Sequence, residues 1–483
     1  MLGGVLIICA LVEAFEFIEL LTVRRGATDQ AAAPTPRRPP FISIHVPICS
    51  EPPEVVARTL GALSNLRYEA FEVLVVDNNT KDERLWRPIE TLCGQLGARF
   101  RFFHLETWPG FKAGALNFAL QNTAKEASLI GIIDADYETA PEFLNNIIGY
   151  FEDESIAFVQ TPQDYRDWGK EAFSRMCYWE YWQVFAVSMN LRNRRNAILM
   201  HGTMSLVRKD AVQRAGGWAE WCLTEDSEMG LRLLADGFRG IYVRTTYGRG
   251  LVPFTYRDYK RQRRRWVIGG VQQFKRHISL FIPRPGRTGR MSILQLFDYL
   301  RGWLLWFRDC VIVVSVPLAC IGTVAILSGL VEPDVFWILA IGLFLIVAQL
   351  VTRQIIVYRI YLAASWRDTL GAMVANVSLI WTIGWAWLAG LATQDHVFQR
   401  TPKRSHSEPS WVEIARGEMI ASAITFLLGI VAAIKFGLSG WGVIVTLWSY
   451  TIFFTPAVWM AWCTASNLDP TNSLTPQRNS SQI

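Results

Sequence analysis

Short apolar runs alternate with helical stretches through residues 41–250. The runs are ISIHVPI, FEVLVVD, FRFFHL and LIGIIDAD, and the stretches that follow them cover 53–66, 82–96, 113–124 and 141–151. Buried parallel strands are typically continuous runs of Val, Ile and Leu, and strands that alternate with helices form βαβ units. The pattern therefore predicts an α/β domain with a central sheet flanked by helices.

A long apolar block precedes this domain. Residues 1–23 are apolar apart from Glu13, Glu16 and Glu19, and two arginines follow them, which is the reverse of the order in a cleaved signal peptide. We interpret the block as a membrane helix with its basic end in the cytoplasm and its glutamate face packed against protein. Residues 24–40 form a Pro- and Ala-rich linker.

Further apolar blocks follow the domain. Four are long enough to cross a bilayer: 302–324, 335–351, 419–436 and 441–462. The stretch 370–391 is rich in Trp and has basic residues on both sides, so we expect an interfacial amphipathic segment there. This interpretation gives five spans, with the N-terminus outside and the α/β domain inside, and a spanning 370–391 would make six.

The complete predicted organisation has nine parts. They are a membrane helix (1–23), a linker (24–40), a cytoplasmic α/β domain (41–250), interfacial helices (251–300), two membrane helices (301–351), an interfacial segment (352–393), a loop (394–416), two membrane helices (417–463) and a disordered tail (464–483).

The composition fits this organisation. Of the 483 residues 51% are hydrophobic and 19% are charged, whereas soluble domains carry about 25% charge. The net charge of +6 is small and spread out, which fits a cytoplasmic membrane face and not a nucleic-acid binder. The eight cysteines include no CxxC pair, which argues against a disulfide framework or a zinc site and for a reducing compartment.

Acidic residues follow two of the predicted strands. Asp77 ends one strand, and Asp134 and Asp136 follow another, at the edge where open α/β sheets bind ligands. One acid of the DAD pair could hold the Mg²⁺ or Mn²⁺ that a nucleotide diphosphate needs, and the other could face the sugar. Asp77 could accept a hydrogen bond from a nucleobase or a ribose hydroxyl. Ordinary turn or helix-cap acids are the alternative for all three.

Two further groups suggest transfer chemistry. Thr224, Glu225 and Asp226 precede the helical pattern 229–235, where a Thr cap and first-turn acids have a structural explanation, although Asp226 could also be a general base. Within the QRRRW stretch, we expect Arg265 to hold phosphate and Trp266 to stack on a sugar. The neighbouring cations should face lipid headgroups: Arg257, Lys260, Arg261, Arg263 and Arg264.

Two smaller features could contact the same phosphate-containing ligand. Lys112 opens a predicted helix just after Gly110, a place where a phosphate could bind. Thr401 and Lys403 lie in the FQRTPK stretch between apolar segments, which could also be an ordinary basic connector.

Taken in order, these residues resemble the D, DxD, TED and QxxRW pattern of processive family 2 glycosyltransferases. The matching positions are Asp77, Asp134 and Asp136, Thr224 to Asp226, and Gln262, Arg265 and Trp266. The stretch 398–403 resembles the gating loop of bacterial cellulose synthase, with Arg400 where that family often has Val. The resemblance implies a GT-A fold, an α/β domain with a mixed central sheet flanked by helices, joined to a helical membrane domain with interfacial helices.

A finer likeness is to bacterial β-(1→3)-glucan synthases of the cyclic or periplasmic type, in the stretches 193–212, 216–233 and 247–266. His201, Gly202 and Thr203 stand where cellulose synthases have Cys-Gly-Ser/Thr, so acceptor contacts are expected there. Those glucan synthases often carry an extra hydrolase-like domain, which we do not expect in this protein, so an accessory glycan-modifying protein is an expected partner.

The resemblance implies an inverting enzyme that polymerises UDP-glucose into a β-glucan, with Mg²⁺ or Mn²⁺, and exports the chain across the bacterial inner membrane. In this scheme Asp226 is the base beside Thr224 and Glu225, and Asp136 and Asp134 hold the metal. The donor contacts are Asp77, Asp134, Lys112, Gln262, Arg265, Thr401 and Lys403, and the acceptor contacts are Trp266, His201, Gly202 and Thr203. Cellulose, chitin or hyaluronan synthesis, a non-processive glucosyl-lipid synthase and a nucleotide-binding transporter remain alternatives.

Overall fold

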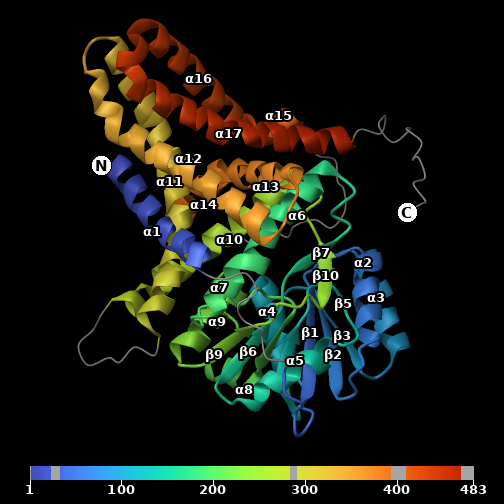
Figure 1. The fold of residues 1–483 in the computed structure, drawn as a ribbon. Helices are drawn as coiled ribbons and strands as arrows, with labels where there is room; N and C mark the ends of the chain where they lie inside the picture. Colours follow the sequence, from blue (N-terminus) through green and yellow to red (C-terminus); the bar gives the residue numbers. More distant parts are fainter. Residues whose placement is uncertain (1, 23–32, 283–290, 393–409, 469–483) are drawn as a thin grey trace.

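The computed structural model describes residues 2–22, 33–282, 291–392 and 410–468. Two layers of structure are evident: a sheet domain and, above it, a group of long helices (Figure 1). Thr401 and Lys403 lie outside the described residues.

A mixed seven-stranded sheet forms the centre of the lower domain, as predicted. Its strand order is β3-β2-β1-β4-β8-β6-β9. The strands are β1 (Phe41–Ile48), β2 (Phe71–Asn78), β3 (Phe100–Leu105), β4 (Ala127–Ile132), β6 (Ile156–Gln160), β8 (Ser205–Arg208) and β9 (Arg239–Tyr242). Strands β1 to β4 are mutually parallel, and β8 runs antiparallel to both β4 and β6. The carboxyl ends of β1, β2 and β4 therefore meet at one edge.

A second, three-stranded sheet lies beside this edge. It has the order β5-β10-β7, with β5 at Glu138–Thr139, β7 at Asp164–Arg166 and β10 at Gly248–Leu251. Strand β5 begins two residues after Asp136, so this small sheet fixes the backbone immediately downstream of the DAD pair.

Helices cover both faces of the large sheet. They are α2 (Pro53–Ser64), α3 (Glu83–Leu96), α4 (Phe111–Asn122), α5 (Phe143–Ile147), α8 (Lys209–Arg214) and α9 (Glu225–Ala235). The apolar faces of α2 and α3 pack on one side of β1 and β2, and α4, α8 and α9 pack on the opposite face. The predicted helices 53–66 and 82–96 agree with α2 and α3 within two residues, because the hydrophobic periodicity of both is strong.

Three further helices join the sheet domain to the upper layer. These are α6 (Ala172–Gln183), α7 (Met189–Asn193) and α10 (Tyr256–His277), and Figure 1 shows them between the sheet and the long helices. The side chain of Thr255 caps α10 by accepting from the backbone N–H of Asp258.

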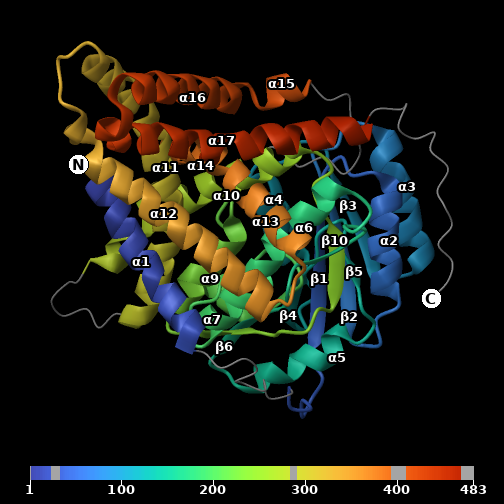
Figure 2. The ribbon, with the colours of Figure 1, turned by 45° about the horizontal axis from the view of Figure 1, so that its top comes forward.

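The upper layer is helical. It contains α1 (Leu2–Thr22), α11 (Ile293–Leu327), α12 (Trp337–Ile355), α13 (Trp366–Ser378), α14 (Ile380–Ala392), α15 (Trp411–Ile414), α16 (Arg416–Phe436) and α17 (Trp441–Leu468). Helices α16 and α17 run side by side (Figures 1 and 2). The glutamate face of α1 meets protein as expected, because Glu13 accepts from Arg308 of α11 at 2.7 Å and Glu19 pairs with Arg195.

Within the described residues, four helical segments are long and apolar enough to cross a membrane: Ile293–Leu327, Pro333–Tyr361, Trp366–Ala392 and Arg416–Ala465. The last of them combines α16 and α17. The stretch interpreted as interfacial, 370–391, falls inside the third segment. Helix α1 is not among the four, because its glutamates lie within any window of spanning length. The count of five or six spans stays a prediction.

Candidate active site

A cavity opens at the carboxyl ends of β1, β2 and β4, where α9 and α10 cover the edge of the sheet. Nine of the residues that line it were expected from the sequence to act in the site: Lys112, Asp134, Asp136, Thr224, Glu225, Asp226, Gln262, Arg265 and Trp266. Segments more than a hundred residues apart in the chain are thus brought together.

Lys112 lies at the centre of the acidic groups. Its Nζ donates to Asp134 Oδ1 at 2.6 Å and to the carbonyl of Gly202 at 2.9 Å, and it lies 3.9 Å from Glu225 Oε1. Burial lowers the pKa of Lys112, but the charges of the neighbouring carboxylates outweigh burial and raise it overall. The ammonium therefore stays protonated in this site.

The two acids of the TED motif have raised pKa values. Burial, helped by the charge of Asp226, raises the pKa of Glu225 to about 7, although Lys112 opposes the shift. Burial also raises the pKa of Asp226, against the opposing charge of Lys112. A carboxylate with a raised pKa is a stronger proton acceptor than an ordinary aspartate, which suits a general base.

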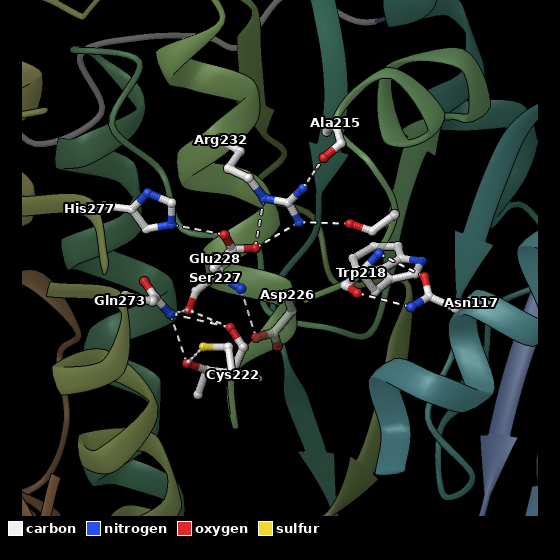
Figure 3. Close-up of polar contacts among 12 residues, drawn as sticks. Asn117, Ala215, Trp218, Cys222, Asp226, Ser227, Glu228, Arg232, Gln273 and His277 are labelled. Atoms are coloured by element: carbon white, nitrogen blue, oxygen red, sulfur yellow. Dashed lines mark hydrogen bonds and ion pairs between the residues drawn. The ribbon is translucent and has the colours of Figure 1, made fainter. Parts of the chain in front are cut away.

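Asp226 is held in the first turn of α9. Its Oδ1 accepts from the backbone N–H of Ser227 at 2.7 Å (Figure 3). Gly202, with φ of +69°, passes so close that an added Cβ would lie 2.3 Å from Asp226 Oδ2. Thr224 occupies the N-cap position as predicted, but its hydroxyl makes no capping bond and instead accepts from Gln273 Nε2 at 2.8 Å.

The DAD pair reaches the cavity from the end of β4. The backbone N–H of Asp134 donates to Thr203 Oγ1 at 3.0 Å, and Asp136 Oδ2 accepts from the N–H of Leu251 at 2.9 Å. Among the described residues there is no group of three or more His, Cys, Asp or Glu arranged to hold a metal. Two cavity-lining carboxylates fit a divalent cation whose remaining oxygen ligands come from a diphosphate and water.

Helix α10 contributes Gln262, Arg265 and Trp266 to the lining. Gln262 Oε1 accepts from the hydroxyl of Tyr181, and the ring of Tyr181 meets Trp266 edge-on at 5.9 Å. Trp266 is therefore fixed in orientation by α6. A fixed Trp ring suits the stacking role expected for it.

The expectation that the other cations of this stretch face lipid is wrong for two of them. Arg263 is largely buried, donates to Glu180 at 2.7 Å and lies 5.2 Å from the ring centre of Trp266. Lys260 pairs with Glu418 at 2.5 Å. A buried cation needs a partner, and both partners come from other helices.

Asp77 and His201 do not line the cavity. Asp77 is 1% exposed and accepts from Thr80 at 2.5 Å, and its Oδ2 lies 2.7 Å from His104 Nδ1. Burial, with a smaller contribution from Arg192, lowers the pKa of His201 to about 3, and its ring packs against Phe185. The donor and acceptor roles expected for these two residues stay predictions.

Sequence reasoning missed two asparagines that shape the cavity. Asn78 Nδ2 donates to the carbonyl of Phe111 at 2.7 Å, and Asn79 bonds both the N–H and the carbonyl of Trp108, at 2.8 and 2.9 Å. These bonds hold the loop that ends at Lys112. The available signal was the Asn-Asn pair directly after a strand, since Asn tolerates the left-handed backbone that Asn79 adopts.

The comparisons with known proteins agree with this geometry. Residues 39–269 match a family described as glycosyltransferase like family 2. One relative is glucomannan 4-beta-mannosyltransferase 1 of Cyamopsis tetragonoloba, which is 25% identical over 288 residues, or 57% of this chain and 54% of the relative. Another is glucomannan 4-beta-mannosyltransferase 2 of Arabidopsis thaliana, which is 24% identical over 58% of this chain and 54% of its own length. The chain spans about half the length of the curated relatives it matches.

Similar solved structures include the mannosyltransferase PcManGT from Pyrobaculum calidifontis in complex with GDP-Man and Mn²⁺. It has a TM-score of 0.49 and 18% identity, and the match covers 79% of this chain and 99% of that one. Another is S. aureus TarS 1–349 in complex with UDP, with a TM-score of 0.35 and 14% identity. This match covers 70% of this chain and 90% of that one. The described mixed sheet agrees with the GT-A fold expected from the resemblance, and residues 39–269 are similar in sequence to the family 2 glycosyltransferases.

Proposed function

We propose that this protein is a membrane-embedded, inverting and processive glycosyltransferase that builds a β-linked glycan from a nucleotide sugar. The observation that carries the proposal is the convergence of the acids and cations on one cavity. Lys112 bridges Asp134 and the TED acids, and the Arg265 and Trp266 side chains line the same cavity from α10. This supplies a diphosphate-binding cation, metal-binding acids, a base and a sugar platform.

The transfer step uses these groups as follows. The donor diphosphate is held by Lys112 and Arg265, which requires Lys112 to exchange Asp134 for phosphate oxygens. A divalent cation held by Asp134 and Asp136 would offset the negative charge that develops on the leaving diphosphate.

Asp226 accepts the proton of the acceptor hydroxyl. The hydroxyl oxygen then forms a bond to the anomeric carbon from the face opposite the diphosphate, and the bond between that carbon and the phosphate oxygen breaks. A single displacement of this kind converts an α-linked donor into a β-linked product.

Export of the product follows from its polarity. A glycan is too polar to cross lipid unaided, so a chain made beneath apolar helices needs a path between them. Helix α10, which carries Trp266, packs against α14 of the upper layer. The proposed arrangement is a bacterial inner-membrane enzyme with a cytoplasmic catalytic domain, and its partners are the growing glycan and membrane lipids.

The donor proposed is UDP-glucose and the product a β-(1→3)-glucan, on the likeness of the sequence stretches described above. A second candidate is mannosyl transfer, which the names of the plant relatives favour. The two differ in the nucleobase and in the sugar, so one donor screen distinguishes them.

The test is a transfer assay with the full chain purified into lipid nanodiscs. Radiolabelled UDP-glucose, GDP-mannose and UDP-N-acetylglucosamine are supplied separately, and the product is sized and digested with linkage-specific glycosidases. A long product from UDP-glucose that β-(1→3)-glucanase degrades supports the proposal. A long mannanase-sensitive product supports the second candidate. A single sugar on lipid, or no transfer from any donor, contradicts processive synthesis.

A further inference from the structure

One face of α10 continues beyond the residues that line the cavity. Gln262, Arg265 and Trp266 are followed at helical spacing by Gly269, Gln272 and Gln273. Residues three and four apart lie on the same side of a helix, so all six belong to one stripe. The first three line the cavity, and the last three contact the segment that leads into Asp226.

Gln273 forms hydrogen bonds with residues that come before and after Asp226 in the chain. Its Nε2 donates to Ser227 Oγ at 2.6 Å and to Thr224 Oγ1 at 2.8 Å, and it lies 3.2 Å from the carbonyl of Thr224 (Figure 3). Gln273 is 3% exposed, so these bonds are shielded from water. The residues before and after Asp226 are therefore tied to one amide nitrogen.

Gln272 and Gly269, on the same stripe, allow α10 to lie close to the segment that precedes Asp226. Gln272 Oε1 accepts from the N–H of Leu223 at 2.9 Å. A Cβ on Gly269 would lie 2.3 Å from Thr224 Oγ1, so only glycine allows this approach. The backbone of α10 at Gly269 therefore packs directly against the side chain of Thr224.

We propose that Gln273 is a positioning residue for the transfer step. It fixes the 224–227 turn, so that the carboxylate of Asp226 keeps its place between Gly202 and the cluster around Lys112. Gln273 does not line the cavity, and it acts only through Thr224 and Ser227. The proposal rests on the base role given to Asp226 in the proposed function. It also makes α10 one rigid element that carries the QxxRW contacts at one end and holds the base at the other.

A second contact between the same helices provides a matched control. His277 Nε2 lies 2.9 Å from Glu228 Oε1, and Arg232 also pairs with Glu228 at 2.8 Å (Figure 3). His277→Phe removes this contact between α10 and α9 but leaves Glu228 paired. It does not touch the turn that holds Asp226.

The experiment compares Gln273→Met with His277→Phe in the full chain. For Gln273→Met we expect kcat to fall about 10- to 100-fold with a donor KM within twofold of wild type, because a shift of the base of about 1 Å has that effect. Hydrogen–deuterium exchange of 222–228 should rise. His277→Phe should keep both kcat and the exchange of 222–228 within twofold of wild type.

Ser227→Ala provides a second variant that removes one acceptor of the same amide without altering α10. We expect a several-fold fall in kcat at unchanged donor KM. Wild-type kcat in Gln273→Met, or equal losses in Gln273→Met and His277→Phe, would overturn the proposal. If wild type transfers no sugar, the proposed function fails, and the exchange data still decide whether Gln273 holds the turn.

Discussion

Lys112 Nζ lies 2.6 Å from Asp134 Oδ1, so the cavity contains an ion pair at the place where an anionic donor would meet the DAD motif. The pair joins the first turn of α4 to the end of β4. The Lys112 side chain is 19% exposed and that of Asp134 is 33% exposed. A partly exposed pair can be opened by a competing anion, and the diphosphate of a nucleotide sugar is such an anion.

Replacing Lys112 should weaken donor use. Lys112→Met removes a charge-assisted bond worth about 1.5–3 kcal/mol, so kcat/KM for the donor should fall about 10- to 100-fold. Steady-state kinetics measures it. Lys209→Met is the control, because Lys209 Nζ binds backbone carbonyls of Ala124 and Lys125 on another surface. Equal kcat/KM values for the two variants would show that Lys112 does not bind the donor.

The contact between Gly202 and Asp226 should be required for turnover. In Gly202→Ala the added Cβ would displace the Asp226 carboxylate, so kcat should fall about 100-fold. Gly216→Ala is matched in backbone, with φ of +86°, but its Cβ would meet nothing within 4 Å. Gly216→Ala should lose about 1 kcal/mol of stability and Gly202→Ala at least as much, and only Gly202→Ala should lose activity. Similar kinetics for the two would show that the contact is unimportant.

Glu225 should make stability depend on pH. Its pKa is about 7 in the folded chain and 4.5 for the unperturbed group, so between these values the folded state binds more protons than the unfolded state. The contribution of Glu225 to stability therefore falls as pH rises through this window. The melting temperature of Glu225→Gln relative to wild type should be higher at pH 8 than at pH 5. A difference that does not change with pH would contradict the raised pKa.

Transfer should need a divalent cation. The two carboxylates of the DAD motif line the cavity, and the diphosphate of the donor would complete the oxygen ligands of a cation. Chelation with EDTA should therefore abolish product formation, and added Mg²⁺ or Mn²⁺ should restore it. Asp136→Asn should require more metal for half-maximal rate, in a titration of rate against metal. Full activity in chelator would refute the metal role of Asp134 and Asp136.

Strands β1 to β4 and the helices between them could be predicted because each is encoded locally. The continuous apolar run of β2 and the periodicity of α3 need no knowledge of the rest of the chain. The meeting of Asp134, Lys112 and Asp226 followed from the rule that strand ends share an edge, together with the motif order. The predicted elements and the predicted meeting of these residues agree with the structure because both predictions depend on spacing and not on side-chain partners.

The remaining features depend on partners that spacing does not reveal. Arg263 was expected at the lipid surface. Its partner, Glu180, is 83 residues earlier in the chain, so the spacing of the motif does not reveal the ion pair. Asp77 was expected to face a ligand; it is 1% exposed and bonds Thr80 and His104, and its donor role stays a prediction. The stripe that ends in Gln273 was not identified from the sequence, because its role depends on the 222–227 segment that lies beside it.

The central claim is that Asp226 is the base of a sugar transfer, and Asp226→Asn tests it most directly. The variant keeps the shape of the side chain but removes the proton acceptor, so the rate of product formation should fall at least about 100-fold. Nucleotide-sugar binding, measured by calorimetry on the same preparation, should stay within a few-fold of wild type. Wild-type rates of product formation from Asp226→Asn would contradict the account.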